Sequence, residues 1–249
     1  MHISFVSTSN RVSPSHGPLW KHMIRSILSL SIVSPQHIHP FICTHFSLKT
    51  NNMHIPTHNC SILQQEFAMF EKKTGYRSDH YSYRFTLLKL FIPRLLVRKN
   101  LISVHDTLMV PDDDTFFIKP IPAVKTPNIT LICKFDPRRC SSNTYRQYGM
   151  CRDDNKFCHG SLYVVNASFA FEFVSILESI ARYFSTNHLS SPTADQDLLN
   201  VLYRNYTTYL LSQSSTWCEE TALTKNKFQE CSMIHLGHGA WAKNLLYLL

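Results

Sequence analysis

Glycine is scarce in this chain, which contains only 6 glycines among 249 residues. That is about a third of the average usage of ~7%. Neither the G-x-G-x-x-G pattern nor a P-loop occurs, so the classes of protein that bind phosphate with a glycine-rich loop are excluded. A phosphate-bearing ligand would therefore depend mainly on a metal ion and on lysine side chains.

Long apolar runs are also missing, since no stretch of about 18 apolar residues exists. The best candidate, residues 86–97, is interrupted by Lys89, Pro93 and Arg94. The N-terminal segment 1–20 has neither the basic start nor the apolar run of a signal peptide. We therefore expect no membrane span, and no recognisable signal or anchor, in this chain.

The remaining composition is that of a folded protein with one large domain or two small ones. Apolar residues make up 44%, charged residues 17% and aromatic residues 12% of the chain, which excludes disorder, collagen and coiled coil. The net charge of +8 suggests an anionic ligand, an acidic partner or an anionic surface. The basic residues are scattered and form no continuous helix face, so we expect no nucleic-acid partner.

The chain has 8 cysteines and no C-x-x-C pair, which points to disulfides. Four cysteines crowd residues 133–158, and Cys218 and Cys231 bracket a short loop. We predict disulfides within the first group, whose pairing stays open, and between Cys218 and Cys231. A zinc site in 133–158 is the alternative, although the gaps between these cysteines do not match common zinc spacings. Sequons agree with an oxidising compartment and lie at Asn59, Asn128, Asn166 and Asn205.

Hydrophobic periodicity predicts an α/β fold. A strand at 2–8, a helix at 19–33 and a strand at 37–43 open the chain, and Pro40 indicates an edge or a bulge in the second strand. Gly75 is expected to end the next helix. The further helices are predicted at 61–73, 80–97, 169–184 and 196–203, and the further strands at 107–111, 116–121, 129–135, 161–166 and 209–212.

Three adjacent carboxylates, Asp112, Asp113 and Asp114, follow the strand at 107–111 with no basic residue between them. They repel one another unless a cation lies among them. In an extended chain Asp112 and Asp114 point to one side and Asp113 to the other, so one divalent ion can be held by the first and the third. Oxygen ligands favour Mg²⁺ or Mn²⁺. An acidic surface turn is the alternative interpretation.

Two further segments carry residues with useful chemistry. Residues 233–243 (MIHLGHGAWAK) combine two histidines and a lysine with two glycines, which suits a metal bound to a diphosphate. An exposed histidine-rich turn is the alternative there. Residues 193–200 (TADQDLLN) contain two acids after Thr193, which equally fits an ordinary helix N-terminus.

The order of these motifs resembles glycosyltransferase family 8 and its relatives, which are sugar-nucleotide enzymes of the GT-A fold. The xylosyltransferases that extend O-linked glucose are the most similar in character, followed by the glucosyltransferase domain of UDP-glucose:glycoprotein glucosyltransferase. An alternative register would put Asp106 in the metal motif, but the segment at 112–121 matches along its whole length. The similar segments are HISFVSTSNR at 2–11, KLFIPRLL at 89–96, DDDTFFIKPI at 112–121, GSLYVVN at 160–166, ADQDLLN at 194–200, WCEE at 217–220 and IHLGHG at 234–239.

The resemblance implies a single GT-A domain over residues 1–249, with a mixed, mostly parallel central sheet flanked by helices. Residues 1–111 would form its nucleotide-binding half and residues 112–249 its metal and acceptor half. Lys89 stands where the family usually has arginine. The site residues implied are Asp112, Asp114 and His235 (or His238) for the metal, Asp195 and Gln196 for catalysis beside the sugar and acceptor, and Ser7, Ser9, Lys89, Asp113, Gly237 and Lys243 for the donor.

The activity that the resemblance implies is transfer of a sugar, with xylose or glucose favoured, from a UDP-sugar to a glycan or glycoprotein acceptor with retained anomeric configuration. Mn²⁺ or Mg²⁺ is the expected cofactor, because UDP is a poor leaving group while its charge is uncompensated. The expected location is the Golgi or endoplasmic-reticulum lumen. The alternative function is that of a secreted, disulfide-bonded binding protein that keeps the fold and has lost catalysis.

Overall fold

The computed structural model describes the chain in pieces and divides it into two compact units. Unit 1 comprises Met1–Asn59, Pro111–Ala123 and Gln213–Leu249, and unit 2 comprises Cys60–Val110 and Val124–Ser212. The described residues are 1–7, 12–13, 17–18, 26, 29, 37–42, 58–77, 81–112, 115–121, 124, 126–135, 140, 156–205, 209–212, 217–219 and 231–235. Most of the predicted helix at 19–33 lies outside these ranges.

Unit 1 contains three parallel strands in the order β1 (His2–Ser7), β4 (His37–Ile42) and β5 (His58–Asn59). Pro40 of β4 lies opposite Phe5 of β1, whereas the pairing of β4 with β5 begins only at Phe41. Proline has no N–H to donate. Its position before the start of the β5 pairing therefore explains why the strand tolerates it.

A second sheet of unit 1 has the order β11 (Trp217–Glu219), β12 (Met233–His235) and β7 (Thr115–Phe117). β11 and β12 are parallel, and β12 and β7 are antiparallel. The predicted strand at 116–121 is shortened to β7, because the N–H groups of Ile118 and Lys119 both donate to the carbonyl of Ser232. A short antiparallel pair, β2 (Val12–Ser13) and β3 (Gly17–Pro18), completes the described strands of this unit.

The described strands of unit 2 lie in the order β10 (Tyr209–Ser212), β8 (Ile129–Phe135), β9 (Lys156–Asn166) and β6 (Thr107–Pro111). β10 is parallel to β8, and β8 is antiparallel to β9. Residues 157–165 of β9 are all buried, as expected for a strand that is covered on both faces. β9 begins at Lys156, five residues before the predicted start at 161. The prediction began too late because His159 and Gly160 interrupt the apolar pattern of the sequence.

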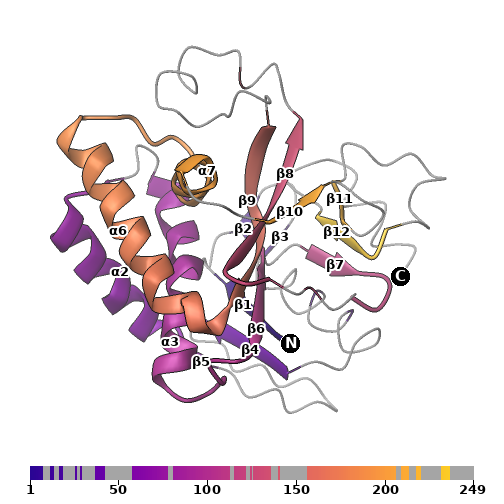
Figure 1. The fold of residues 1–249 in the computed structure, drawn as a ribbon. Helices are drawn as coiled ribbons and strands as arrows, with labels where there is room; N and C mark the ends of the chain where they lie inside the picture. The colour runs from indigo at the N-terminus through magenta and orange to yellow at the C-terminus, as the bar shows by residue number, and fades with distance from the viewer. Residues whose placement is uncertain are drawn as a thin grey trace. The chain divides into compact units, whose positions relative to one another are not determined.

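The helices of unit 2 pack on one another and on these strands (Figure 1). α2 (Ser61–Thr74) packs against the 3₁₀ helix η1 (Tyr81–Phe91) and against α6 (Ala170–Thr186), which follows the short η2 (Ala167–Phe169). α6 also contacts α3 (Ile92–Arg98) and α7 (Asp195–Asn205), and α7 lies on β9. The predicted helix at 80–97 is divided into η1 and α3, because Pro93 lies in the first turn of α3 and cannot continue a preceding α-helix.

Charged side chains join three of these helices. Glu66 of α2 is buried and forms ion pairs with Arg94 and, at 2.6 Å, with Arg98 of α3. Arg94 also lies 3.8 Å from Glu178 of α6. The buried carboxylate is thus paired, as a buried charge must be. The aromatic side chains packed between these helices are Phe67, Phe70, Tyr76, Phe91 and Phe184.

The predicted α/β class, with mixed and mostly parallel strands flanked by helices, is confirmed. The strands predicted at 107–111, 129–135 and 209–212 occur with these bounds. None of the helices in the described ranges is both long and apolar enough to cross a membrane.

Gly75 ends α2 as predicted, in the left-handed region at φ 68°, and its N–H donates to the carbonyl of Glu71 at 2.8 Å. A Cβ at this position would lie 2.7 Å from Oγ of Ser185. We expect Gly75→Ala to lower the free energy of unfolding by about 1–2 kcal/mol through the backbone conformation alone. Urea denaturation of the two proteins measures the loss.

The same substitution in a Ser185→Ala background separates the two causes. The hydroxyl contact is then gone, whereas the positive φ is unchanged. The loss should shrink to the contribution of the backbone alone, which is about 1–2 kcal/mol. If it disappeared in this background, the hydroxyl contact and not the backbone would be what requires glycine.

Candidate active site

A buried ion pair between η1 and α7 forms the centre of the candidate site in unit 2. Lys89 is 5% exposed, and Asp195, the first residue of α7, is 4% exposed. Nζ of Lys89 lies 2.8 Å from Oδ2 of Asp195, and Oγ1 of Thr86 donates to Oδ1 at 2.5 Å. Both carboxylate oxygens are therefore held, which offsets part of the cost of burying the charge.

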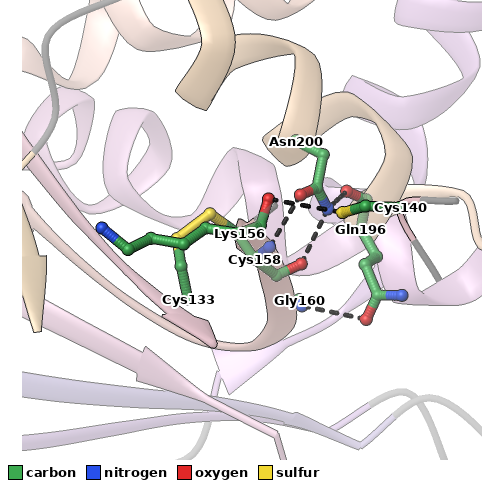
Figure 2. Close-up of a disulfide and its surroundings, with 7 residues drawn as sticks. All are labelled: Cys133, Cys140, Lys156, Cys158, Gly160, Gln196 and Asn200. Carbon is green, nitrogen blue, oxygen red and sulfur yellow. Dashed lines mark hydrogen bonds between the residues drawn. A yellow bond between two sulfur atoms is a disulfide. The ribbon is translucent and has the colours of Figure 1, made fainter. Parts of the chain in front are cut away.

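Gly160 of β9 makes the close approach of α7 possible. A Cβ at this position would lie 2.5 Å from Oδ2 of Asp195 and 3.3 Å from Cβ of Gln196. The carbonyl of Gly160 accepts from Nζ of Lys89 at 2.5 Å. Its N–H donates to Oε1 of Gln196 at 3.3 Å (Figure 2). Glycine is required here because no side chain fits between the strand and the helix.

Tyr163 of β9 anchors the backbone of Lys89, since its hydroxyl donates to the carbonyl of Lys89 at 2.6 Å. Burial raises the pKa of Tyr163 well above its usual value of 10, and the negative charge of Asp195 raises it further. The phenol therefore remains protonated at physiological pH and keeps donating this hydrogen bond.

The residues before α7 are held by Asp197, whose side chain is fully buried. Its Oδ2 accepts from the backbone N–H of Thr193 at 2.8 Å and from Oγ of Ser191 at 3.0 Å, and its Oδ1 accepts from the Thr193 hydroxyl. Tyr76 forms hydrogen bonds to Ser191 and, at 3.3 Å, to the carbonyl of Ala194. The segment at 193–200 is thus a helix N-terminus, and the polar groups just before it are satisfied.

Ala194, immediately before Asp195, has a positive φ of 51°. This left-handed conformation costs a non-glycine residue about 1–2 kcal/mol. The surrounding hydrogen bonds to Asp197 and Tyr76 hold it in place. Backbone strain of this kind is concentrated at functional sites, and here it sets the direction in which α7 begins.

A disulfide between Cys133 and Cys158 joins directly opposed residues of β8 and β9 (Figure 2). It confirms the prediction of a disulfide within residues 133–158. Cys60, Cys140 and Cys231 are disulfide-bonded as well, and no cysteine in the described ranges has a free thiol. These bonds exclude the alternative zinc site. The pairing of Cys231 with Cys218 stays a prediction, because the side chain of Cys218 lies outside the described part of the structure.

A second pair of candidate residues, Asp112 and His235, lies in unit 1. Asp112 directly follows β6, and its carbonyl accepts from the N–H of Thr115 at 3.2 Å, which turns the chain into β7. His235 is the last residue of β12 and lies opposite Thr115. Its Nε2 is 3.7 Å from Oδ2 of Asp112, and both side chains are partly exposed.

The donor atoms of this pair suit a divalent cation. Their separation of 3.7 Å is less than twice a metal–ligand distance of about 2.1 Å, so one ion can contact both. A carboxylate oxygen and an imidazole nitrogen are common ligands of divalent transition metals. In the described ranges no group of three His, Cys, Asp or Glu residues suited to a metal occurs. Asp113 and Asp114 fall outside those ranges.

The alternative register would use Asp106, which precedes β6 instead of following it. Its Oδ2 accepts from the N–H of Ser103 at 2.7 Å, so the carboxylate belongs to a local turn. Ser7 is the last residue of β1. Some of the predicted site residues lie outside the described part of the chain, so their roles stay predictions. These residues are Ser9, Gly237, His238 and Lys243.

Sequence reasoning missed several side chains of the unit 2 site, of which Thr86 and Asn200 are the clearest. Thr86 lies three residues before Lys89, and side chains at this spacing eclipse one another in a 3₁₀ helix. Asn200 lies four residues after Gln196, a spacing that puts two residues on one face of an α-helix. These spacings are the signals in the sequence that would have identified them.

Comparison of the sequence with protein-family models and with curated proteins gives no match. Solved structures match over nearly the whole chain. The apo form of mouse xyloside xylosyltransferase 1 has a TM-score of 0.61 at 11% identity, covering 95% of this chain and 97% of its own. The galactosyltransferase LgtC, in complex with donor and acceptor sugar analogs, has a TM-score of 0.60 at 12% identity, covering 99% and 95%. An active-site glutamine-to-glutamate mutant of LgtC has a TM-score of 0.58 at 11% identity, covering 96% and 88%.

These similarities establish the fold. The chain has the GT-A glycosyltransferase fold, as the order of its motifs led us to expect. At 11–12% identity the activity has to be argued from the side chains themselves.

The buried carboxyl of Asp197 makes the stability of the fold depend on pH. Burial raises its pKa from 3.8 to about 6, and the charge of Asp195 contributes to the rise, although hydrogen bonds from Thr193 and Ser191 oppose it. Between these values the folded chain keeps a proton that the unfolded chain has released, so stability falls as the pH rises. The rise of this pKa from 3.8 to about 6 corresponds to about 3 kcal/mol.

We therefore expect the parent and Asp197→Asn to differ in the pH dependence of their stability. Asparagine does not titrate, so the comparison isolates this carboxyl from every other group. The free energy of unfolding of the parent, relative to the variant, should fall by about 3 kcal/mol between about pH 3 and about pH 7. Urea denaturation across this range measures it, and a constant difference would contradict a raised pKa.

Proposed function

We propose that the chain is a metal-dependent glycosyltransferase that moves a sugar from a UDP-sugar to a glycan or glycoprotein acceptor. Xylose and glucose are the favoured sugars, and retention of the anomeric configuration is proposed from the family resemblance. The observation that carries the proposal is the buried Lys89–Asp195 pair, which fixes the start of α7 beside Gly160 in a chain with this fold. A buried ion pair is weak evidence for stability alone, and such groups are often functional.

Gln196 is the side chain best suited to contact a sugar. Its Oε1 accepts from Gly160, so its NH₂ group points away from β9 (Figure 2). This group carries two donors, which would bind a hydroxyl or ring oxygen of the donor sugar or acceptor. LgtC has a glutamine in its active site, according to the mutant structure, which supports the assignment. Asp195 would accept from sugar hydroxyls, while Lys89 and Thr86 hold its orientation.

Asp112, Asp114 and His235 would hold Mn²⁺ or Mg²⁺ at the diphosphate of the donor, and the 3.7 Å approach of His235 to Asp112 supports this. When bound, the cation neutralises the charge that develops on the departing UDP. We propose residues 1–249 as one transferase domain, with the nucleotide served by 1–111 and the metal and acceptor by 112–249. The remaining donor contacts proposed are Ser7, Ser9, Asp113, Gly237 and Lys243.

We propose the lumen of the Golgi or endoplasmic reticulum as the location. The disulfide between Cys133 and Cys158, together with the bonded state of Cys60, Cys140 and Cys231, supports an oxidising compartment. The second candidate function is that of a binding protein that keeps the fold without catalysis. It is favoured by one observation, namely that Lys89 and Thr86 already occupy both carboxylate oxygens of Asp195.

Calorimetry of UDP binding with and without Mn²⁺ tests the metal site. The parent should bind UDP weakly without the metal, because the chain has no glycine-rich loop to supply fixed donors. Asp112→Ala and Asp114→Ala should abolish the metal-dependent binding, and His235→Ala should weaken it more than His238→Ala. Asp113→Ala should weaken it less, since its side chain points the other way in an extended chain.

Asp106→Ala is the matched control, because it removes a carboxylate next to the other end of β6. It should leave Mn²⁺-dependent UDP binding intact. Metal-independent binding in the parent, or equal losses in the Asp113 and Asp114 variants, would mean that the acidic triplet is only a surface turn.

A further inference from the structure

The side-chain amide of Asn200 in α7 makes three hydrogen bonds to the backbone. It is fully buried. Its Oδ1 accepts from the N–H of Cys158 at 2.7 Å, and its Nδ2 donates to the carbonyls of Cys158 and of Gln196, each at 2.7 Å (Figure 2). One amide thus joins both backbone groups of a β9 residue to the first turn of α7.

An amide is well matched to this position. It offers an acceptor and two donors in one plane, and here it takes the place that a neighbouring strand would occupy along β9. Leaving a buried donor or acceptor without a partner costs about 1–3 kcal/mol. The three bonds of Asn200 therefore restrict where α7 can lie against Cys158.

Cys158 is also held from the opposite direction, because its side chain is bonded to Cys133 of β8. Two residues further along β9, the N–H of Gly160 donates to Oε1 of Gln196. The backbone from Cys158 to Gly160 is thus the common reference for Asn200 and Gln196. A shift of Asn200 relative to Cys158 would move Gln196 relative to Gly160.

We propose that Asn200 is a positioning residue, which sets the location of Gln196 by fixing α7 to the disulfide-bonded part of β9. The proposal rests on the proposed function, in which Gln196 contacts the sugar. Asn200 itself touches no reacting atom. Its effect is on the orientation of Gln196, and small misplacements of a positioned group reduce the rate by as much as roughly 10²-fold.

The test compares Asn200→Asp with the parent in Mn²⁺-dependent hydrolysis of UDP-xylose and UDP-glucose. The substitution keeps the shape and the acceptor but removes both donors. We expect kcat to fall by roughly 10- to 100-fold, while KM changes little because the nucleotide contacts remain. As the pH is lowered, protonation of the introduced carboxyl restores one donor, so the variant should recover relative to the parent.

Asn187→Asp is the matched control. Asn187 is exposed at the end of α6, and its Nδ2 donates to the carbonyl of Tyr183 at 2.8 Å, so the chemical change is the same away from the site. It should leave kcat, KM and the pH profile unchanged. Equal behaviour of the two variants would overturn the proposal, as would a change in KM alone.

Two further measurements keep the outcome decisive. If Asn200→Asp does not fold, Asn200→Ser introduces no charge and should show the same loss of kcat; failure of both to fold would assign Asn200 to stability and overturn the proposal. If the parent hydrolyses neither UDP-sugar, the choice of xylose or glucose as the donor sugar fails, and hydrogen exchange of the Gly160 amide decides the positioning claim. Faster exchange in Asn200→Asp than in Asn187→Asp would support it, and equal exchange would refute it.

Discussion

The close approach of α7 to β9 at Gly160 determines the geometry of the unit 2 site. Because this residue has no side chain, Asp195 reaches Lys89, and Gln196 reaches the backbone of β9. Other contacts depend on the same approach: Asn200 can bond to both backbone groups of Cys158 only while α7 lies this close to the strand. One position without a Cβ therefore allows the helix, the ion pair and the strand to share a small, buried volume.

This arrangement is more costly than an apolar contact would be. It buries Lys89 and Asp195 as charges, holds Asp197 as a carboxyl with a raised pKa, and keeps Ala194 at a positive φ. Replacing a buried ion pair by well-packed apolar residues is often neutral or stabilising. Polar groups that are retained in spite of such costs are typical of functional sites, which is why the proposed sugar-binding role is assigned to this part of unit 2.

The elements were easier to predict from the sequence than the site. The strands at 129–135 and 209–212 follow from hydrophobic periodicity. The helix end at Gly75 follows from the left-handed conformation that glycine adopts readily. Local pattern does not show a contact such as that of Thr86 with Asp195, which are 109 residues apart. Two errors were local. The apolar pattern runs through Pro93, so one helix was predicted where two occur. The polar residues near the start of β9 led to a predicted start that is too late. The pairing of Asp112 with His235 was suggested by the order of motifs and not by spacing.

We propose that this chain transfers sugar from a UDP-sugar with the help of a divalent cation. The most direct measurement is release of UDP from a panel of UDP-sugars by the purified chain, with Mn²⁺ and with a chelator. We expect release from at least one UDP-sugar, which should depend on the metal and be lost in Gln196→Ala while the fold is retained. Metal-dependent UDP binding without release from any of these donors would contradict it, and would identify the chain as a binding protein with the GT-A fold.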